Sequence, residues 1–135
     1  METLRLEELK KIPLFQNLEN DEIASVLELA ERENYRKGDL VFKQDDEAKK
    51  LFIVEKGLIA IIIQLKPGTD RTVVTESRGG AFGWSALLPP HRYTTSAECR
   101  EPSNLLALDG LKLRELCYQK PNLGVKVMEG LAHFI

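Results

Sequence analysis

The chain has 135 residues, of which 43% are hydrophobic and 30% are charged, and its formal net charge at pH 7 is −2. This length and composition predict one soluble globular domain over residues 1–135, and they exclude a disordered chain or two domains of ordinary size. The small negative charge also gives no electrostatic basis for binding nucleic acid, which usually requires a basic face.

Residues 1–34 show the spacing of helices. A short helix is expected over Thr3–Lys11, because Pro13 lacks the backbone N–H that a continuing helix would need. A second helix is expected after Asn20, which is a favourable N-cap residue. Its apolar residues follow the i, i+3, i+4, i+7 pattern of a helix face that packs on a core; they are Ile23, Val26, Leu27 and Ala30.

From Tyr35 onward, short apolar segments alternate with turns. Turn residues such as Pro67-Gly68 separate the segments and fix where each strand ends. Short strands joined by turns rich in glycine and proline indicate an antiparallel sandwich or a small barrel. The expected strands are Leu40–Gln44, Leu51–Glu55, Leu58–Leu65, Thr72–Glu76, Thr95–Glu98 and Asn104–Leu108.

Two helices are predicted after the strands. Asp109 is expected to cap a helix through Tyr118, and Pro121 fits the first turn of a last helix that runs to Ile135. This last helix carries an apolar stripe that either folds back on the barrel as a lid or forms a dimer contact. We predict a homodimer through this helix, because strand Leu58–Ile63 is apolar at every position and needs cover on both faces. The stripe is Leu123, Val127, Leu131 and Phe134, widened by Met128 and Ile135.

The segment from Gly79 to Cys99 has the composition of a ligand-binding loop. Glycines precede the apolar turn Trp84–Leu88, and a glycine-rich loop that opens a short helix can offer free N–H groups to an anion. The double proline Pro89-Pro90 then ends that helix. A tight corner of a β-barrel explains the same residues, so both interpretations stay open here.

Four motifs follow one another in a characteristic order: I-P-L-F-Q-N-L, K-G-D-L-V-F-K-Q, L-F-I-V-E-K-G-L-I-A-I and G-A-F-G-W-S-A-L-L-P. Together they resemble the cyclic-nucleotide-binding domains, of which the catabolite activator protein and the regulatory subunit of cyclic-AMP-dependent protein kinase are familiar examples. The resemblance implies a mainly β fold, a double-stranded β-helix jelly roll of eight strands with flanking N- and C-terminal helices. It places helices at 1–34, the jelly roll at 35–109 and helices at 110–135, within a single domain.

The resemblance also implies a phosphate-binding cassette, and this chain departs from it at two positions. In the family, a glutamate binds the ribose hydroxyl and an arginine pairs with the cyclic phosphate. Trp84 stands at the glutamate position and Tyr93 at the arginine position, while Arg92 lies one residue earlier. Side chains alternate in an extended chain, so Arg92 is expected on the opposite face unless a bulge or helical turn redirects it. The candidate ligand-binding residues are Phe82, Gly83, Trp84, Ser85, Ala86, Leu87, Arg92, Tyr93, Thr94 and Thr95.

Two functions are therefore open. The first is a regulatory module that senses a small anionic ligand, a cyclic nucleotide or another anion, but does not bind cyclic AMP with high affinity. The second is a ligand-free interaction or dimerisation module that kept the fold. We favour the first, because the glycine-rich turn is complete and only ligand-facing side chains differ.

Enzyme, metal and membrane functions are not expected. His91 and His133 are too far apart in the sequence for a metal site, no cofactor motif occurs, and no nucleophile has a convincing histidine partner. No apolar run is long enough to span a bilayer, and the acidic N-terminus is unlike a signal peptide. Cys99 and Cys117 fit buried thiols in a reducing cytoplasm. The chain ends at the last predicted helix, so no DNA-binding domain is expected in it.

Overall fold

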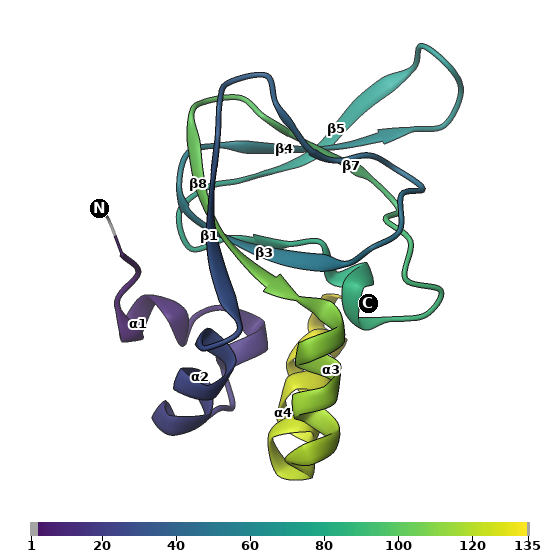
Figure 1. Cartoon of the computed structure of the whole chain (residues 1–135). Coiled ribbons are helices and arrows are strands. Elements are labelled where there is room, and N and C mark those ends of the chain that lie inside the picture. Colours follow the sequence, from purple (N-terminus) through teal and green to yellow (C-terminus); the bar gives the residue numbers. More distant parts are fainter. Residues whose placement is uncertain (1–2, 135) are drawn as a thin grey trace.

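The computed structural model describes residues 3–134 and confirms a mainly β fold with flanking helices (Figure 1). The helices are α1 (Leu6–Leu9), η1 (Pro13–Phe15), α2 (Asn20–Leu27), η2 (Trp84–Leu87), α3 (Gly110–Gln119), α4 (Pro121–Leu131) and η3 (Ala132–Phe134). The strands are β1 (Ala30–Tyr35), β2 (Leu40–Phe42), β3 (Lys50–Lys56), β4 (Ile59–Gln64), β5 (Asp70–Glu76), β6 (Ala81–Phe82), β7 (Ser96–Cys99) and β8 (Ser103–Asp109).

The strands form two four-stranded antiparallel sheets, in the orders β1-β8-β3-β6 and β2-β7-β4-β5. Each sheet mixes strands that are distant in the sequence, as in the predicted jelly roll. Figure 1 shows the helices on one side of the β1-β8-β3-β6 sheet and the second sheet on its other side.

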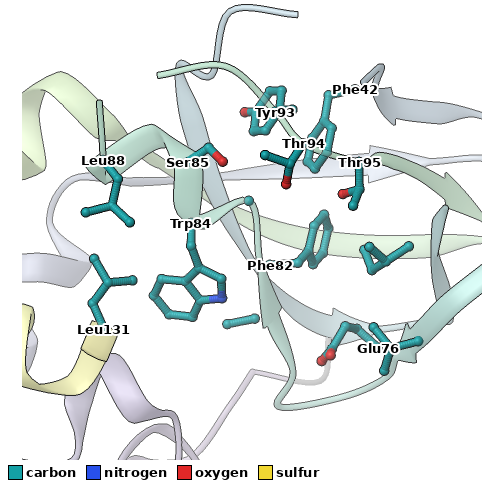
Figure 2. Close-up of a pocket in the computed structure, with 14 residues that line it drawn as sticks. Phe42, Glu76, Phe82, Trp84, Ser85, Leu88, Tyr93, Thr94, Thr95 and Leu131 are labelled. Carbon is teal, nitrogen blue, oxygen red and sulfur yellow. The ribbon is translucent and has the colours of Figure 1, made fainter. Parts of the chain in front are cut away.

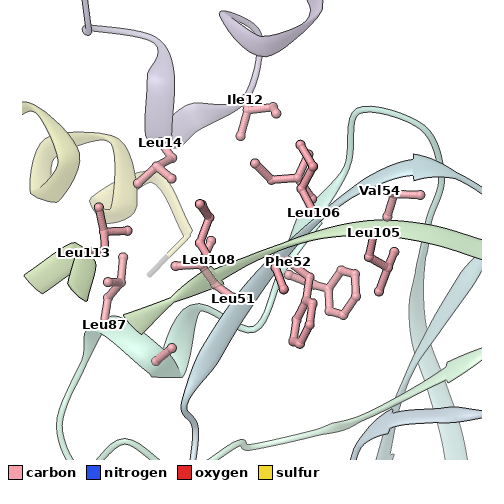
Figure 3. Close-up of a cluster of buried hydrophobic side chains, with 14 of the residues drawn as sticks. Ile12, Leu14, Leu51, Phe52, Val54, Leu87, Leu105, Leu106, Leu108 and Leu113 are labelled. Carbon is pink, nitrogen blue, oxygen red and sulfur yellow. The ribbon is translucent and has the colours of Figure 1, made fainter. Parts of the chain in front are cut away.

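This sandwiched position explains the continuous apolar sequences of β3 and β8. A strand that is covered on both faces buries successive residues instead of alternate ones, and Leu51–Val54 and Leu105–Leu108 are all buried. Figure 3 shows their side chains meeting Leu14 of η1, Leu87 of η2 and Leu113 of α3. The main core therefore joins the helices to the sheet that carries β6 and the loop after it.

The boundary expected at residue 34 is wrong in one respect. Helix α2 ends at Leu27, and Ala30, which we placed on its apolar face, begins strand β1. The sequence of β1, A-E-R-E-N-Y, is mostly polar because the strand lies at the edge of its sheet. Its backbone pairs with β8 from Ala30 opposite Leu108 to Tyr35 opposite Ser103. The first helix is also shorter than predicted and covers only Leu6–Leu9.

The C-terminal helices begin as predicted, but the apolar stripe of α4 has a different partner. The Asp109 side chain accepts a hydrogen bond from the Lys112 N–H at 3.0 Å, which confirms the cap of α3. The stripe residues Leu123, Val127 and Leu131 are buried within the chain, where α4 packs on α3 and η1. They are therefore not available for a contact between two copies. Ile135 and the side chain of Phe134 lie outside the described part of the structure.

One arginine fastens the N-terminal helix to the sheets. The Arg78 guanidinium donates to both carboxylate oxygens of Glu8, each at 3.0 Å, and also to the backbone oxygens of Glu55 and Thr3. These hydrogen bonds, together with one from the Arg5 N–H, lower the pKa of Glu8 from 4.5 to about 2. The turn after β5 is thus tied to α1 by a charge-assisted contact.

We expect this contact to contribute to the acid sensitivity of the fold. Because the folded-state pKa of Glu8 is depressed, its contribution is complete above about pH 4.5 and is lost as the pH falls towards 2. The melting temperature of the wild-type protein should therefore fall more steeply over this range than that of Glu8→Gln. Glu7→Gln, on the same helix, is the matched control, and an equal slope for Glu8→Gln and the wild type would contradict the assignment.

Candidate functional site

A pocket of about 310 Å³ lies between the segment Phe82–Leu88 and the strands of the second sheet (Figure 2). Its wall combines residues from β2, β4, β5 and β6 with the segment that leads into β7 and with one residue of α4. The lining residues are Phe42, Ile61, Val74, Glu76, Ala81, Phe82, Gly83, Trp84, Ser85, Leu88, Tyr93, Thr94, Thr95 and Leu131.

The floor of the pocket is a short loop and helical turn, as the sequence predicts. Strand β6 pairs with β3 and positions Gly83, which adopts a left-handed φ of +84° and leads into η2. The Ala86 N–H donates to the Gly83 carbonyl at 3.2 Å, and the buried side chains of Ala86 and Leu87 hold the turn on the core. The turn ends before the double proline.

Gly83 is expected to resist substitution. A Cβ there would lie 3.2 Å from the Lys50 carbonyl oxygen and 3.3 Å from the Leu51 Cα, in addition to the cost of a positive φ. Gly79 has nearly the same φ, +85°, but open space around it, so Gly79→Ala measures the φ cost alone. By urea unfolding, we expect Gly79→Ala to lose about 1–2 kcal/mol and Gly83→Ala about 1 kcal/mol more. A higher melting temperature for Gly83→Ala would identify Gly83 as an ordinary helix-entry residue.

Tyr93 forms part of the pocket wall, at the position where the resemblance leads us to expect an arginine. Its ring stacks on Phe42 with the centroids 3.6 Å apart, and its hydroxyl bonds the backbone of Lys50, donating to the carbonyl and accepting from the N–H. Burial raises the pKa of Tyr93, so the phenol remains a neutral hydrogen-bond donor. The tyrosine therefore fills and fixes this wall and brings no positive charge to it.

Arg92 does not replace that charge. Its side chain is exposed, and its Nη1 donates to the Asp45 carbonyl at 2.9 Å, outside the pocket lining. This agrees with the alternation expected for an extended chain. No lysine or arginine occurs among the lining residues that the structure describes.

The charged group in the pocket wall is instead a carboxylate. Glu76 lies at the end of β5, and burial raises its pKa above 4.5. Among residues 3–134, no side chain or backbone group forms a hydrogen bond or ion pair with the Glu76 carboxylate. Figure 2 shows the hydroxyl groups of Ser85 and Thr95 on the other walls. The pocket therefore offers aromatic rings, hydroxyls and one acid, but its described lining has no cationic side chain to pair with a phosphate.

Most of the predicted site residues come together in this pocket. Ala86 and Leu87 lie beneath the turn in the core, and Arg92 lies outside the pocket, so these three do not line it. The remaining lining residues were not predicted from the sequence; they are Phe42, Ile61, Val74, Glu76, Ala81, Leu88 and Leu131. One signal was present in the sequence, because Glu76 is a lone acid that ends a run of threonine and valine shortly before the glycine pair Gly79-Gly80.

Two further features bear on the kind of site. Residues 3–134 contain no group of three histidine, cysteine or acidic side chains placed to hold a metal ion. Over the same range, every helix is too short or too polar to cross a bilayer.

Comparison with known proteins shows which family and which relatives have sequences similar to this chain. The family model described as "Cyclic nucleotide-binding domain" matches residues 32–120. A putative potassium channel protein of Rhodopseudomonas palustris is 26% identical over 117 residues, which cover 87% of this chain but only 28% of that protein. The chain thus spans a minor part of this relative.

Solved structures agree over most of the chain. The catabolite activator protein of Thermus thermophilus superposes with a TM-score of 0.79 and 28% identity, over 90% of this chain and 57% of that one. A putative cyclic nucleotide-binding protein of Geobacter metallireducens has a TM-score of 0.81 at 24% identity, over 97% and 95% of the two chains. The second likeness is one of fold alone.

Proposed function

Because the chain belongs to the cyclic nucleotide-binding domain family, we propose that it is a non-catalytic regulatory module in which a small ligand occupies the pocket above Gly83. We further propose that cyclic AMP and cyclic GMP bind there weakly or not at all. Ligand binding in such a module acts by changing the stability or position of the elements that form the pocket wall, here including the end of α4.

One observation carries this proposal: the loop and helical turn that form the pocket floor are present, while the wall has one acid and no described positive charge. The wall contains Glu76, and no described lysine or arginine lines it. A hydrogen bond to a charged group contributes about 1.5–3 kcal/mol, so each lost contact weakens binding about 10- to 100-fold. Losing the family's arginine and glutamate contacts together is sufficient to remove useful affinity for a cyclic nucleotide. The side chains thus support a small-ligand pocket, but the described lining supplies no positive charge to pair with an anionic ligand.

Isothermal titration calorimetry with cyclic AMP and cyclic GMP tests the proposal. We expect dissociation constants weaker than about 100 μM for both, and a modest gain in affinity for Glu76→Gln, which removes a like charge from the wall. Glu47→Gln, at an exposed position outside this pocket, is the control variant. A low-micromolar or tighter constant for the wild-type protein would contradict the proposal.

A second candidate function, a ligand-free interaction or dimerisation module, is favoured by a different surface. A groove of about 780 Å³ runs between η2 and helices α3 and α4, and the exposed side chains of Tyr118, Val125 and Met128 line it. A homodimer through the C-terminal helix would use this face of α4 and not the buried stripe.

Light scattering at micromolar concentration distinguishes a monomer from a dimer, since the monomer has a mass of about 15 kDa. A dimer with no co-purified ligand in native mass spectrometry would favour this second function.

A further inference from the structure

We propose that the pocket selects a small organic cation, with its ammonium group held between the aromatic side chains and the Glu76 carboxylate. The inference rests on the proposed function, because it names the ligand class of the same pocket. It also reverses the charge preference that the family resemblance implies. Figure 2 shows the indole of Trp84, the ring of Phe82 and the carboxylate of Glu76 around one space.

The first support is the number and rigidity of the aromatic rings in the wall. Phe42 stacks on Tyr93, and its ring centroid lies 5.9 Å from that of Phe82, which in turn stacks on Phe52 at 5.3 Å. These contacts fix the rings before any ligand binds. Trp84 supplies a further ring from η2. Cations are attracted to the faces of aromatic rings, and indole is the strongest such partner.

The second support is the contrast between Glu76 and other acids that are buried or partly buried. Glu55 is paired with Arg32, Glu33 with Lys50 and Glu22 with Lys126, at distances between 2.7 and 3.0 Å. The Glu76 side chain has no such partner within residues 3–134 and lines a pocket instead. A half-buried carboxylate is stabilised by a nearby positive charge, and a cationic ligand would supply it.

The third support is the size and polarity of the space. A volume of about 310 Å³ lies at the lower end for ligand pockets, which limits the ligand to a compact molecule. Apolar side chains such as Leu88 and Leu131 cover one side, as Figure 2 shows. A short alkyl or aryl chain with one ammonium group matches this combination of an apolar side, aromatic rings and one acid.

Pairs of probes that are similar in size and shape but differ in charge test the inference. Choline is compared with its neutral carbon isostere dimethylbutanol, and isoamylamine with isoamyl alcohol. Trp84 is the only tryptophan of the chain, so quenching of its fluorescence reports on this pocket, and calorimetry gives the affinities. We expect at least one cation to bind about tenfold or more tightly than its neutral partner.

Variants at Glu76 connect any preference to the proposed contact. Glu76→Gln should abolish the preference for the cation, Glu76→Asp should keep part of it, and Glu47→Gln should leave it unchanged. Equal binding of the charged and neutral probes would overturn the cation inference while leaving a small-ligand pocket in place. If neither the amines nor the alcohols bind, the cation inference fails, whereas the proposed function fails if a cyclic nucleotide binds with a low-micromolar or tighter dissociation constant.

Discussion

Replacing Gly130 by alanine is expected to destabilise the protein by about 2–3 kcal/mol, although alanine is the better helix former. Gly130 lies in α4 where this helix crosses η1. A Cβ at this position would overlap the Pro13 carbonyl oxygen, and it would lie only 2.9 Å from the Pro13 carbonyl carbon and 3.3 Å from the Leu14 Cα. These are backbone atoms, so relief requires the helix to move away from the core.

The sign of the effect makes this test decisive. In an exposed helix, glycine to alanine gains about 1 kcal/mol from helix propensity, so stabilisation would show that the crossing can relax without cost. Glu129→Ala, one residue earlier on the exposed side of the helix, is the matched control and should change stability little. Urea unfolding of the three proteins gives the comparison, with the slope of the transition as a check on two-state behaviour.

Arg32→Ala is expected to cost about 2–3 kcal/mol, because it leaves Glu55 without its charge partner. Glu55 is only 3% exposed, and its two carboxylate oxygens accept from Arg32 at 3.0 and 3.4 Å. We place the value below the usual range for a fully buried pair because 45% of the Arg32 side chain is exposed to solvent.

The double variant Arg32→Ala with Glu55→Gln separates the charge from the packing. If the loss arises from an unpaired buried carboxylate, the neutral glutamine should recover a clear part of it. Unfolding in urea at neutral pH measures both variants and Glu55→Gln alone. No recovery in the double variant would show instead that Arg32 acts mainly through the packing of its side chain.

The sequence predicts this fold well where burial follows a repeating pattern. The apolar segments that became β3 and β8, and the cap at Asp109, carry their structural role in their own residues. The residues of strand β1 do not reveal a strand in the same way. This strand is polar and lies at the edge of its sheet, and its partner β8 lies about seventy residues later in the sequence. The stripe on α4 indicated a buried face, but the stripe alone did not specify whether η1 or a second copy covers it.

The pocket was predictable only in part for a similar reason. Gly83 and Trp84 were found because a loop and helical turn are local and have their own composition. Phe42, Ile61 and Glu76 reach the same space from three strands, and only the register of the sheets brings them together. Local composition therefore predicts the loop and helical turn, while the charge of the pocket depends on which strands the topology brings together.

Leu131 lines the pocket and is also buried where the end of α4 meets the core. The position of this one side chain therefore affects both ligand binding in the pocket and the packing of α4 on the core. A ligand that binds only the docked form must slow the opening of α4, which would be visible as slower amide hydrogen exchange along Leu123–Leu131. Coupling of this kind is reciprocal, so a partner that holds α4 in place would tighten the ligand by the same factor.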